Sequence, residues 1–224
     1  MRTKPSAREA RRPIELSPVC IRVAVITVCA IVSASGISGC DTLFPIPSAP
    51  VPIILDSDHV LGNANAPVTV VEYSSFSCHW CGLFARDEFA TLEARYVDTG
   101  QVRWVFRSLL SMGDSAQVLP ACAVECAADQ GRYFDYRERL FENRGDLSES
   151  ALKEHATALG IERAAFDDCL DGESKIARVQ QDVDSGFALG ADSTPTFFID
   201  GEMVRGYQTA DEFGAVIDRH LAGL

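Results

Sequence analysis

A pair of cysteines separated by two residues lies between a strand pattern and a helix pattern, and this junction constrains the fold most. The tetrad is Cys78-His79-Trp80-Cys81. It follows a β-branched run over 68–73, which predicts a buried strand. It precedes a run over 83–97 with apolar residues at helical spacing, and 102–106 predicts a second strand. These patterns together predict a βαβ unit.

A long helical pattern then interrupts the strands. From about 115 to 187, apolar and aromatic residues recur at the spacing of helix faces. Within this block, Asp146 and Glu149 predict a capping box for a helix that ends near Gly160.

Strand signals return after the helical block. The run 196–199 predicts a strand, Asp200-Gly201 a hairpin turn, and 203–205 the partner strand. Apolar residues over 210–221 predict a closing helix. A sheet interrupted by helices is one α/β domain with an inserted helical domain, not two domains in series. The expected parts are 56–110 for the first sheet-forming part, 111–187 for the helical insertion, and 188–224 for the second sheet-forming part.

Residues 1–39 have the pattern of an export signal. A basic stretch precedes an apolar run over 23–37, which is too short to span a bilayer comfortably. The segment ends in Ile37-Ser38-Gly39-Cys40, which resembles the lipobox of bacterial lipoproteins. The resemblance implies that Cys40 is lipidated and becomes the mature N terminus. An ordinary cleavage site and an uncleaved signal anchor are the alternatives. We expect a proline-rich linker over 40–55.

The charge balance changes when this signal is removed. The whole chain has 20 Lys and Arg against 32 Asp and Glu. Residues 1–39 contain six of the basic and two of the acidic residues, so a net charge of −16 remains. This charge argues against binding to nucleic acid or to anionic lipid. A lipid anchor would therefore hold the protein at the extracytoplasmic face of a bacterial membrane.

Five of the eight cysteines remain after the predicted signal and the lipidated residue are set aside. They are Cys78, Cys81, Cys122, Cys126 and Cys169. Export would place them in an oxidising compartment, where disulfides persist. An odd number leaves at least one thiol unpaired or bonded to another molecule.

A Cys-x-x-Cys motif between a strand and a helix suits thiol–disulfide exchange. The first cysteine lies at a helix N terminus, where free N–H groups stabilise its thiolate. The second lies one turn further and closes the disulfide. A zinc site would need Cys122 and Cys126 as its second pair, but these are four residues apart on a predicted helix. A purely structural Cys78–Cys81 disulfide would close too small a loop to stabilise much. We expect no metal and no cofactor.

Four segments together resemble the DsbA-like branch of the thioredoxin superfamily. They are Phe76-x-Cys78-x-x-Cys81, the run 193–201, the run 62–68, and Cys126-Ala-Ala-Asp-Gln130-Gly131. The resemblance covers 56–224 and implies a thioredoxin-like fold. It also implies an extracytoplasmic thiol:disulfide oxidoreductase that oxidises the thiols of exported proteins and passes electrons to a quinone-linked membrane partner. A reductase or isomerase and a non-catalytic metal- or peptide-binding lipoprotein are the alternatives.

The resemblance also implies residue roles. Cys78 would be the nucleophile and Cys81 the resolving thiol. Pro195 would be a cis-proline opposite the tetrad, and Thr194 would offer backbone hydrogen bonds to a bound peptide. A trans proline at a strand edge is the alternative. Glu72 would be a buried acid beneath Cys81 that relays its proton, although a glutamate at a strand end is usually solvated.

The central dipeptide His79-Trp80 departs from the Cys-Pro-His-Cys of the founding family member. Protonated His79 would stabilise the Cys78 thiolate, and an exposed loop imidazole is the alternative. Trp80 would either add apolar surface for unfolded substrates or cover the cysteine pair. Since the redox potential depends on this dipeptide, the departure leaves the direction of electron flow open.

The remaining cysteines fall in the helical block. Cys126 and Cys169 stand where many members of the branch have a disulfide, and two buried free thiols are the alternative. Cys122 lies one turn before Cys126 and could compete for Cys169, so it is the candidate for the leftover thiol. No dimerisation segment is evident before the tetrad, so we expect a monomer.

Overall fold

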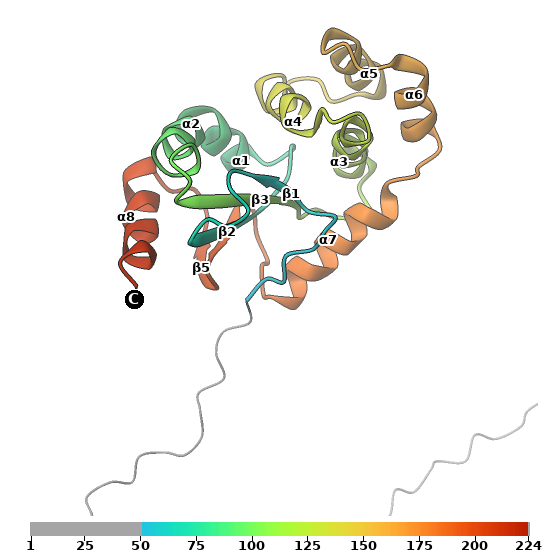
Figure 1. The fold of residues 1–224 in the computed structure, drawn as a ribbon. Coiled ribbons are helices and arrows are strands. Elements are labelled where there is room, and N and C mark those ends of the chain that lie inside the picture. The colour runs from blue at the N-terminus through green and yellow to red at the C-terminus, as the bar shows by residue number, and fades with distance from the viewer. Residues whose placement is uncertain (1–50, 224) are drawn as a thin grey trace, which may run out of the picture. The chain divides into compact units, whose positions relative to one another are not determined.

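The structure is a computed structural model that describes residues 51–223. The predicted signal peptide, Cys40 and most of the predicted linker lie outside the described residues. Within them, one five-stranded sheet has the strand order β1-β3-β2-β4-β5 (Figure 1). The strands are β1 (His59–Leu61), β2 (Val68–Ser74), β3 (Val102–Ser108), β4 (Thr196–Ile199) and β5 (Glu202–Arg205). β2 is parallel to β3 and antiparallel to β4.

The helices fall into two groups. One group packs on the sheet: α1 (His79–Leu83), η1 (Phe84–Glu88), α2 (Phe89–Leu92), η2 (Glu93–Val97) and α8 (Ala210–Leu221). The other lies between β3 and β4 in the chain: α3 (Ser115–Ala128), α4 (Tyr133–Glu142), α5 (Glu149–Ala158), α6 (Arg163–Asp171) and α7 (Ile176–Ala188). Figure 1 shows α3 to α6 as a bundle beside the sheet, with α7 leading back to it. The predicted order βαβ, helical block, ββα is therefore observed. No helix of the described part is long and apolar enough to cross a membrane.

The helix that follows the tetrad is longer than its apolar pattern predicted. The predicted range was 83–97, but the helical run begins at His79 and continues without a break through η1 and η2. The two η segments are π-helical turns, in which Phe89 N–H bonds to the carbonyl of Phe84 and Asp98 N–H to that of Glu93. The run therefore places the second cysteine of the tetrad inside the first helical turn.

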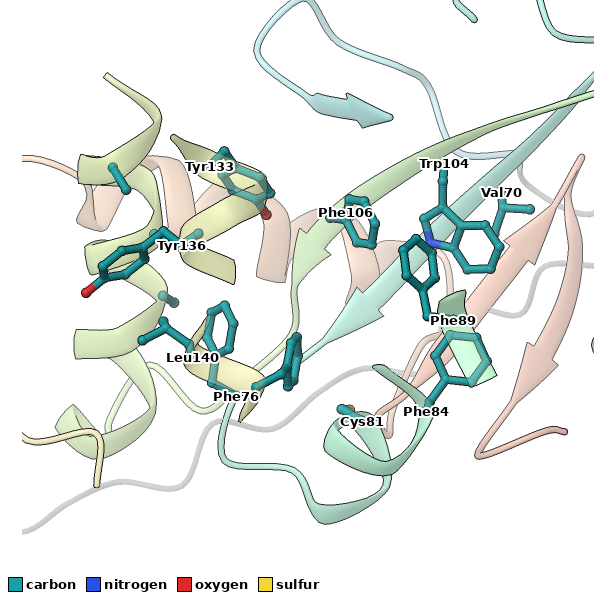
Figure 2. Close-up of a cluster of buried hydrophobic side chains, with 14 of the residues drawn as sticks. Val70, Phe76, Cys81, Phe84, Phe89, Trp104, Phe106, Tyr133, Tyr136 and Leu140 are labelled. Atoms are coloured by element: carbon teal, nitrogen blue, oxygen red, sulfur yellow. The ribbon is translucent and has the colours of Figure 1, made fainter. Parts of the chain in front are cut away.

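The core joins one face of the sheet to the helical block. Figure 2 shows Phe84 and Phe89 beside Trp104 of β3, with Tyr136 and Leu140 of α4 in the same cluster. The ring centroids of Phe89 and Trp104 are 5.1 Å apart, in an edge-to-face arrangement. A second, smaller cluster lies on other residues of the strands and includes Tyr73, Val105 and Phe198. Alternate residues of a strand point to opposite faces, so β2 and β3 serve both clusters.

One local prediction in the helical block is wrong. Helix α5 begins at Glu149, and its N-cap is Ser148, whose hydroxyl accepts the N–H of Ala151. Asp146 instead accepts the backbone N–H of Ser148, so it forms a turn ahead of the helix and no capping box. A capping box does open α8, between Thr209 and Glu212.

Candidate active site

Cys78 lies at the N-cap of α1, immediately after the loop that follows β2. Its backbone is extended, and its sulfur accepts the N–H of Cys81 over 3.2 Å. Its thiol donates to the carbonyl of Thr194 over 3.3 Å. Hydrogen bonds from the Cys81 thiol first of all, then from the Thr194 side chain and from the backbone of Cys81 and Trp80, lower the pKa of Cys78 to about 5, although partial burial opposes the shift. At neutral pH, Cys78 is therefore a thiolate.

Cys81 has the opposite environment. It is fully buried, and burial together with the neighbouring Cys78 raises the pKa of its thiol far above the usual value. The hydroxyl of Ser74 lowers this pKa, but by less. Cys78 is therefore a stable thiolate near the surface, and Cys81 is a protonated thiol in the interior.

The sheet register brings Thr194 and Pro195 to the cysteines. Tyr73 near the end of β2 pairs with Thr196 at the start of antiparallel β4, so the loop before β4 meets the loop after β2. The Thr194–Pro195 peptide bond is cis. The carbonyl of Pro195 accepts the N–H of Gly206, which anchors this loop to the residue that follows β5.

Glu72 is fully buried on β2, six residues before Cys78. One carboxylate oxygen accepts the indole N–H of Trp104 over 3.0 Å, and the other pairs with Arg137 of α4, also over 3.0 Å. The guanidinium of Arg137 lies 3.8 Å from the ring centroid of Phe106, which adds a cation–π contact. The burial implied for Glu72 is observed, and its role as a proton relay stays a prediction.

His79 and Trp80 both lie at the surface. Trp80 is 54% exposed, and its ring lies near His79 and near Tyr207, with centroids 5.4 Å and 5.9 Å away. Trp80 therefore forms an apolar patch beside Cys78.

A second arginine of the helical block holds the loop before the tetrad. Arg144, just after α4, donates to the carbonyl of Phe76 over 2.9 Å and to that of Ser77 over 3.2 Å. Its side chain also lies against Gly82, where an added Cβ would lie 2.6 Å from the Arg144 Cζ atom. A larger residue at position 82 would therefore displace this clamp.

Neither Arg137 nor Arg144 was singled out in the sequence. Each acts across more than 60 residues, and no local pattern marks an arginine of a helical block as a partner of a distant strand. The helical block contains six arginines, and nothing in the sequence distinguishes these two from the other four.

The other cysteines lie in the helical block. Cys126 of α3 and Cys169 of α6 form a disulfide, with Cα atoms 5.9 Å apart. Cys122 is a buried free thiol, and burial raises its pKa to about 11, so it is a poor nucleophile. In the described part of the chain, no group of three or more His, Cys, Asp and Glu side chains could hold a metal ion.

An open groove runs beside the cis-proline loop. It has a volume of about 540 Å³, and Ser193 and Thr194 are among the residues that line it. Val183 and Phe187 of α7 line it with apolar surface, and Phe187 is 57% exposed. The groove shares Thr194 with the cysteine site, because the Thr194 carbonyl contacts the Cys78 sulfur, so a substrate chain could lie in it.

The chain belongs to the thioredoxin family, because the family model described as Thioredoxin matches residues 55–219. Among solved structures, oxidised BdbD from Bacillus subtilis matches with 27% identity and a TM-score of 0.67, over 73% of this chain and 92% of that one. The alpha-DsbA1 protein of Wolbachia pipientis matches with 25% identity and a TM-score of 0.68, over 77% and 94%. These matches place the chain in the DsbA-like branch of the family.

The curated relatives divide into two kinds. Disulfide bond formation protein D of Bacillus subtilis is 26% identical over 178 residues, which are 73% of this chain and 77% of that protein. Na(+)/H(+) antiporter NhaA 1 of Salinispora arenicola is 34% identical over 175 residues, which are 77% of this chain but 26% of the antiporter. The chain therefore spans about a quarter of the length of the antiporter relatives that it matches.

Proposed function

We propose that the protein is an extracytoplasmic dithiol oxidase that forms disulfides in exported proteins through Cys78 and Cys81. The observation that carries this proposal is the pKa of Cys78, lowered to about 5, beside a buried Cys81 thiol. A stable Cys78 thiolate stabilises the reduced form of the pair, and an oxidant is strong when its reduced form is stable.

The reaction follows from the two thiol environments. A substrate thiolate attacks the Cys78 sulfur of the Cys78–Cys81 disulfide, and Cys81 leaves and takes up a proton. A second substrate thiolate then attacks the substrate sulfur of this mixed disulfide, and Cys78 leaves as a stable thiolate. Two electrons pass from the substrate to the cysteine pair, and the substrate gains one disulfide. A membrane redox partner would reoxidise the pair.

Substrate recognition would use the surfaces around Cys78. Thr194 would bind an extended substrate segment through its backbone. Exposed Trp80 lies next to Cys78 in the tetrad, and exposed Phe187 lines the groove that Thr194 also lines. His79 would add positive charge when protonated. Unfolded chains expose apolar side chains, so such surfaces suit an enzyme that acts before its substrates finish folding.

The location of the enzyme follows from the first part of the chain. We propose that residues 1–39 direct export and that lipidated Cys40 anchors a monomeric domain at the outer face of the membrane. Anchoring would keep the pair near a membrane redox partner.

A redox titration of Cys78 and Cys81 against glutathione tests the direction of electron flow, with Cys122→Ser as the control. A potential near the roughly −120 mV of DsbA supports the oxidase, and one near the roughly −270 mV of thioredoxin overturns it in favour of a reductase. Cys78→Ser should have no thiol oxidase activity. Full activity in that variant would overturn both the oxidase and the reductase that act through Cys78. Bound zinc or copper without any activity would support the binding-protein alternative.

A further inference from the structure

A pocket of about 400 Å³ lies between the helical run that follows the tetrad and helix α4. One wall comes from η1, α2 and η2, the other from α4, and Leu61 of β1 and Phe106 of β3 complete the lining. The tetrad, Thr194 and Pro195 do not line this pocket. Small-molecule sites commonly have volumes of about 300–1,000 Å³, so this pocket has the size of a ligand site. It is separate from the surface where disulfide exchange would take place.

The interior of the pocket is aromatic. Phe89 and Phe106, both labelled in Figure 2, are buried, and Phe134 is half-buried. The ring centroid of Phe106 lies 5.6 Å from that of Phe89 and 5.8 Å from that of Phe134. Ala85 and Ala90 line the same pocket, and their short side chains leave room beside the rings. Such a lining suits the apolar body of a ligand.

Both π-helical turns of the run after the tetrad contribute to one wall of this pocket. η1 contributes Ala85 and Arg86, and η2 contributes Glu93. Single π-helical turns are rare, and they occur frequently at functional sites. Their position is therefore a second indication, independent of the pocket volume, that this wall serves a function.

Three carboxylates of the pocket have no cation of their own. Glu93 lies on η2, and Glu138 and Glu142 lie on α4, which forms the opposite wall. Within residues 51–223, none of these three forms an ion pair, whereas Asp135, the fourth carboxylate of the pocket, pairs with Arg132 over 3.0 Å. Glu138 and Glu142 are four residues apart on one helix, where like charges repel each other.

The carboxylates of the two walls also act on each other. Burial raises the pKa of Glu93, and the charges of Asp98 and Glu138 raise it further, although Arg137 opposes the shift. A cation placed between like charges relieves such repulsion. The rim of the pocket therefore favours a positive charge.

The two arginines that line the pocket do not supply this charge. Arg86 bonds Asp87 over 2.6 Å and 2.8 Å. Arg137 pairs with Glu72 over 3.0 Å, and its guanidinium lies 3.8 Å from the ring centroid of Phe106. The contact with Phe106 shows that the ring faces of this pocket accept a cation.

We propose that this pocket binds a small organic cation with an apolar body, of the arylalkylammonium class. The apolar body would lie against Phe89 and Phe134, and the ammonium group would lie at the rim between Glu93 and Glu138. The ammonium group would stay away from the interior, because Arg137 carries a positive charge there. A neutral ligand would lose the contacts at the rim, and an anion would be repelled.

Titration calorimetry with three probes of equal length tests the proposal. The probes are 4-phenylbutylammonium, 4-phenylbutanol and 4-phenylbutyrate. Charge pairs near a surface contribute up to about five-fold each, so we expect the cation to bind about five-fold tighter than the alcohol and the anion to bind most weakly. The preference for the cation should shrink as salt is added. Equal binding of the cation and the alcohol, or tighter binding of the anion, would overturn the proposal.

Charge variants separate the pocket from the general negative charge of the protein. The double variant Glu93→Gln/Glu138→Gln should bind the cation no more tightly than the alcohol. Glu154→Gln is the matched control, because Glu154 is an exposed carboxylate of α5 outside the pocket, and it should keep the wild-type preference. A wild-type preference in the double variant, or an equal loss in the control, would contradict a site at this rim.

Shape variants test the position of the apolar body. Ala90→Leu narrows the pocket and should weaken the binding of all three probes, whereas Ala94→Leu, on the same helical run but outside the pocket, should bind them as the wild type does. Urea unfolding checks that each variant is folded. Unchanged affinities in folded Ala90→Leu would overturn the proposal. Cys78→Ser should bind the cation normally, so this result stands or fails apart from the proposed function.

Discussion

The two faces of the central strands each bury an arginine–carboxylate pair, but the two pairs are completed differently. On one face, Arg107 of β3 forms two bonds to Asp58, of 2.9 Å and 2.7 Å, and further bonds to Tyr73 and to the carbonyl of Ile53. On the other face, Arg137 has one bond to Glu72 and is otherwise surrounded by aromatic rings.

The difference separates a pair that lies away from the tetrad from one whose carboxylate lies on the strand that leads to the tetrad. Arg107 and Asp58 bond to each other and to other side chains and backbone of the domain, not to the cysteine pair. Neither side chain lines the groove beside the cis-proline loop. Both arginines line a small cavity beside Ser74, but Glu72 of the second pair lies on β2, the strand that leads to the tetrad. The pair of Arg107 and Asp58 is held by several hydrogen bonds, whereas Arg137 is held by one bond to Glu72 and by aromatic rings.

The largest expected effect is on the structural pair. Asp58→Ala leaves Arg107 buried without its carboxylate, and breaking a buried pair in this way costs about 3–5 kcal/mol. Urea unfolding should show this loss, while the Cys78 alkylation midpoint stays unchanged. The surface variant Asp167→Ala should lose less than about 1 kcal/mol. If Asp58→Ala also shifted the pH midpoint of Cys78 alkylation, the pair of Arg107 and Asp58 would affect the cysteine site and would not be purely structural.

Glu72→Gln should cost less stability than Asp58→Ala. The amide keeps an oxygen for Trp104, and the aromatic rings around Arg137 continue to stabilise its charge. We expect a loss of about 1–3 kcal/mol in urea unfolding, the usual cost of an incompletely satisfied buried group. An equal or larger loss than in Asp58→Ala would mean that both pairs are mainly structural.

Arg144→Met tests the clamp on the loop before the tetrad. It removes two bonds to backbone carbonyls at a partly exposed site, so we expect a loss of about 1–2 kcal/mol. Hydrogen exchange should rise in the amides of the loop and hardly at all in β2. The control is Arg163→Met, which loses surface bonds to Asp167 and Thr157, far from the loop in the sequence. Unchanged exchange in the loop would contradict a positioning role for Arg144.

The smallest expected effect is a pH dependence on the structural face. Burial raises the pKa of Asp182 to about 6, although Arg178 opposes the shift. Between about pH 4 and 6, Asp182 is protonated in the folded protein but ionised in the unfolded chain. Because the folded state binds the extra proton, the contribution of Asp182 to the free energy of unfolding falls as the pH rises. Asp182→Asn should remove that part of the slope in urea unfolding. If stability instead fell more steeply with rising pH in the variant than in the wild type, the assigned sign would be wrong.

Local patterns predicted most of the fold. The strand that ends before the tetrad, the hairpin around Asp200-Gly201 and the helix α8 were found because each is coded by neighbouring residues. The strand β1 was not predicted, because three residues are too few to show a pattern. The capping box at Asp146 failed because a nearer serine competes for the same helix end.

The site was predictable only in part. Cys78 and Cys81 stand out by their spacing, whereas Glu72 and Pro195 were identified through the family resemblance. Neither the spacing nor the family resemblance identified Arg137, because its bond to Glu72 joins α4 to β2, which are far apart in the sequence. Long-range pairs of this kind are fixed by how the helical block docks on the sheet, which no short stretch of sequence encodes.

The positions of the two tryptophans have a practical consequence. The chain contains two: Trp80 between the two cysteines of the tetrad, and Trp104 bonded to Glu72. One ring faces solvent and the other is fully enclosed. Intrinsic fluorescence of single-tryptophan variants can therefore report separately on the surface around the cysteine pair and on the interior around Glu72, without an added dye.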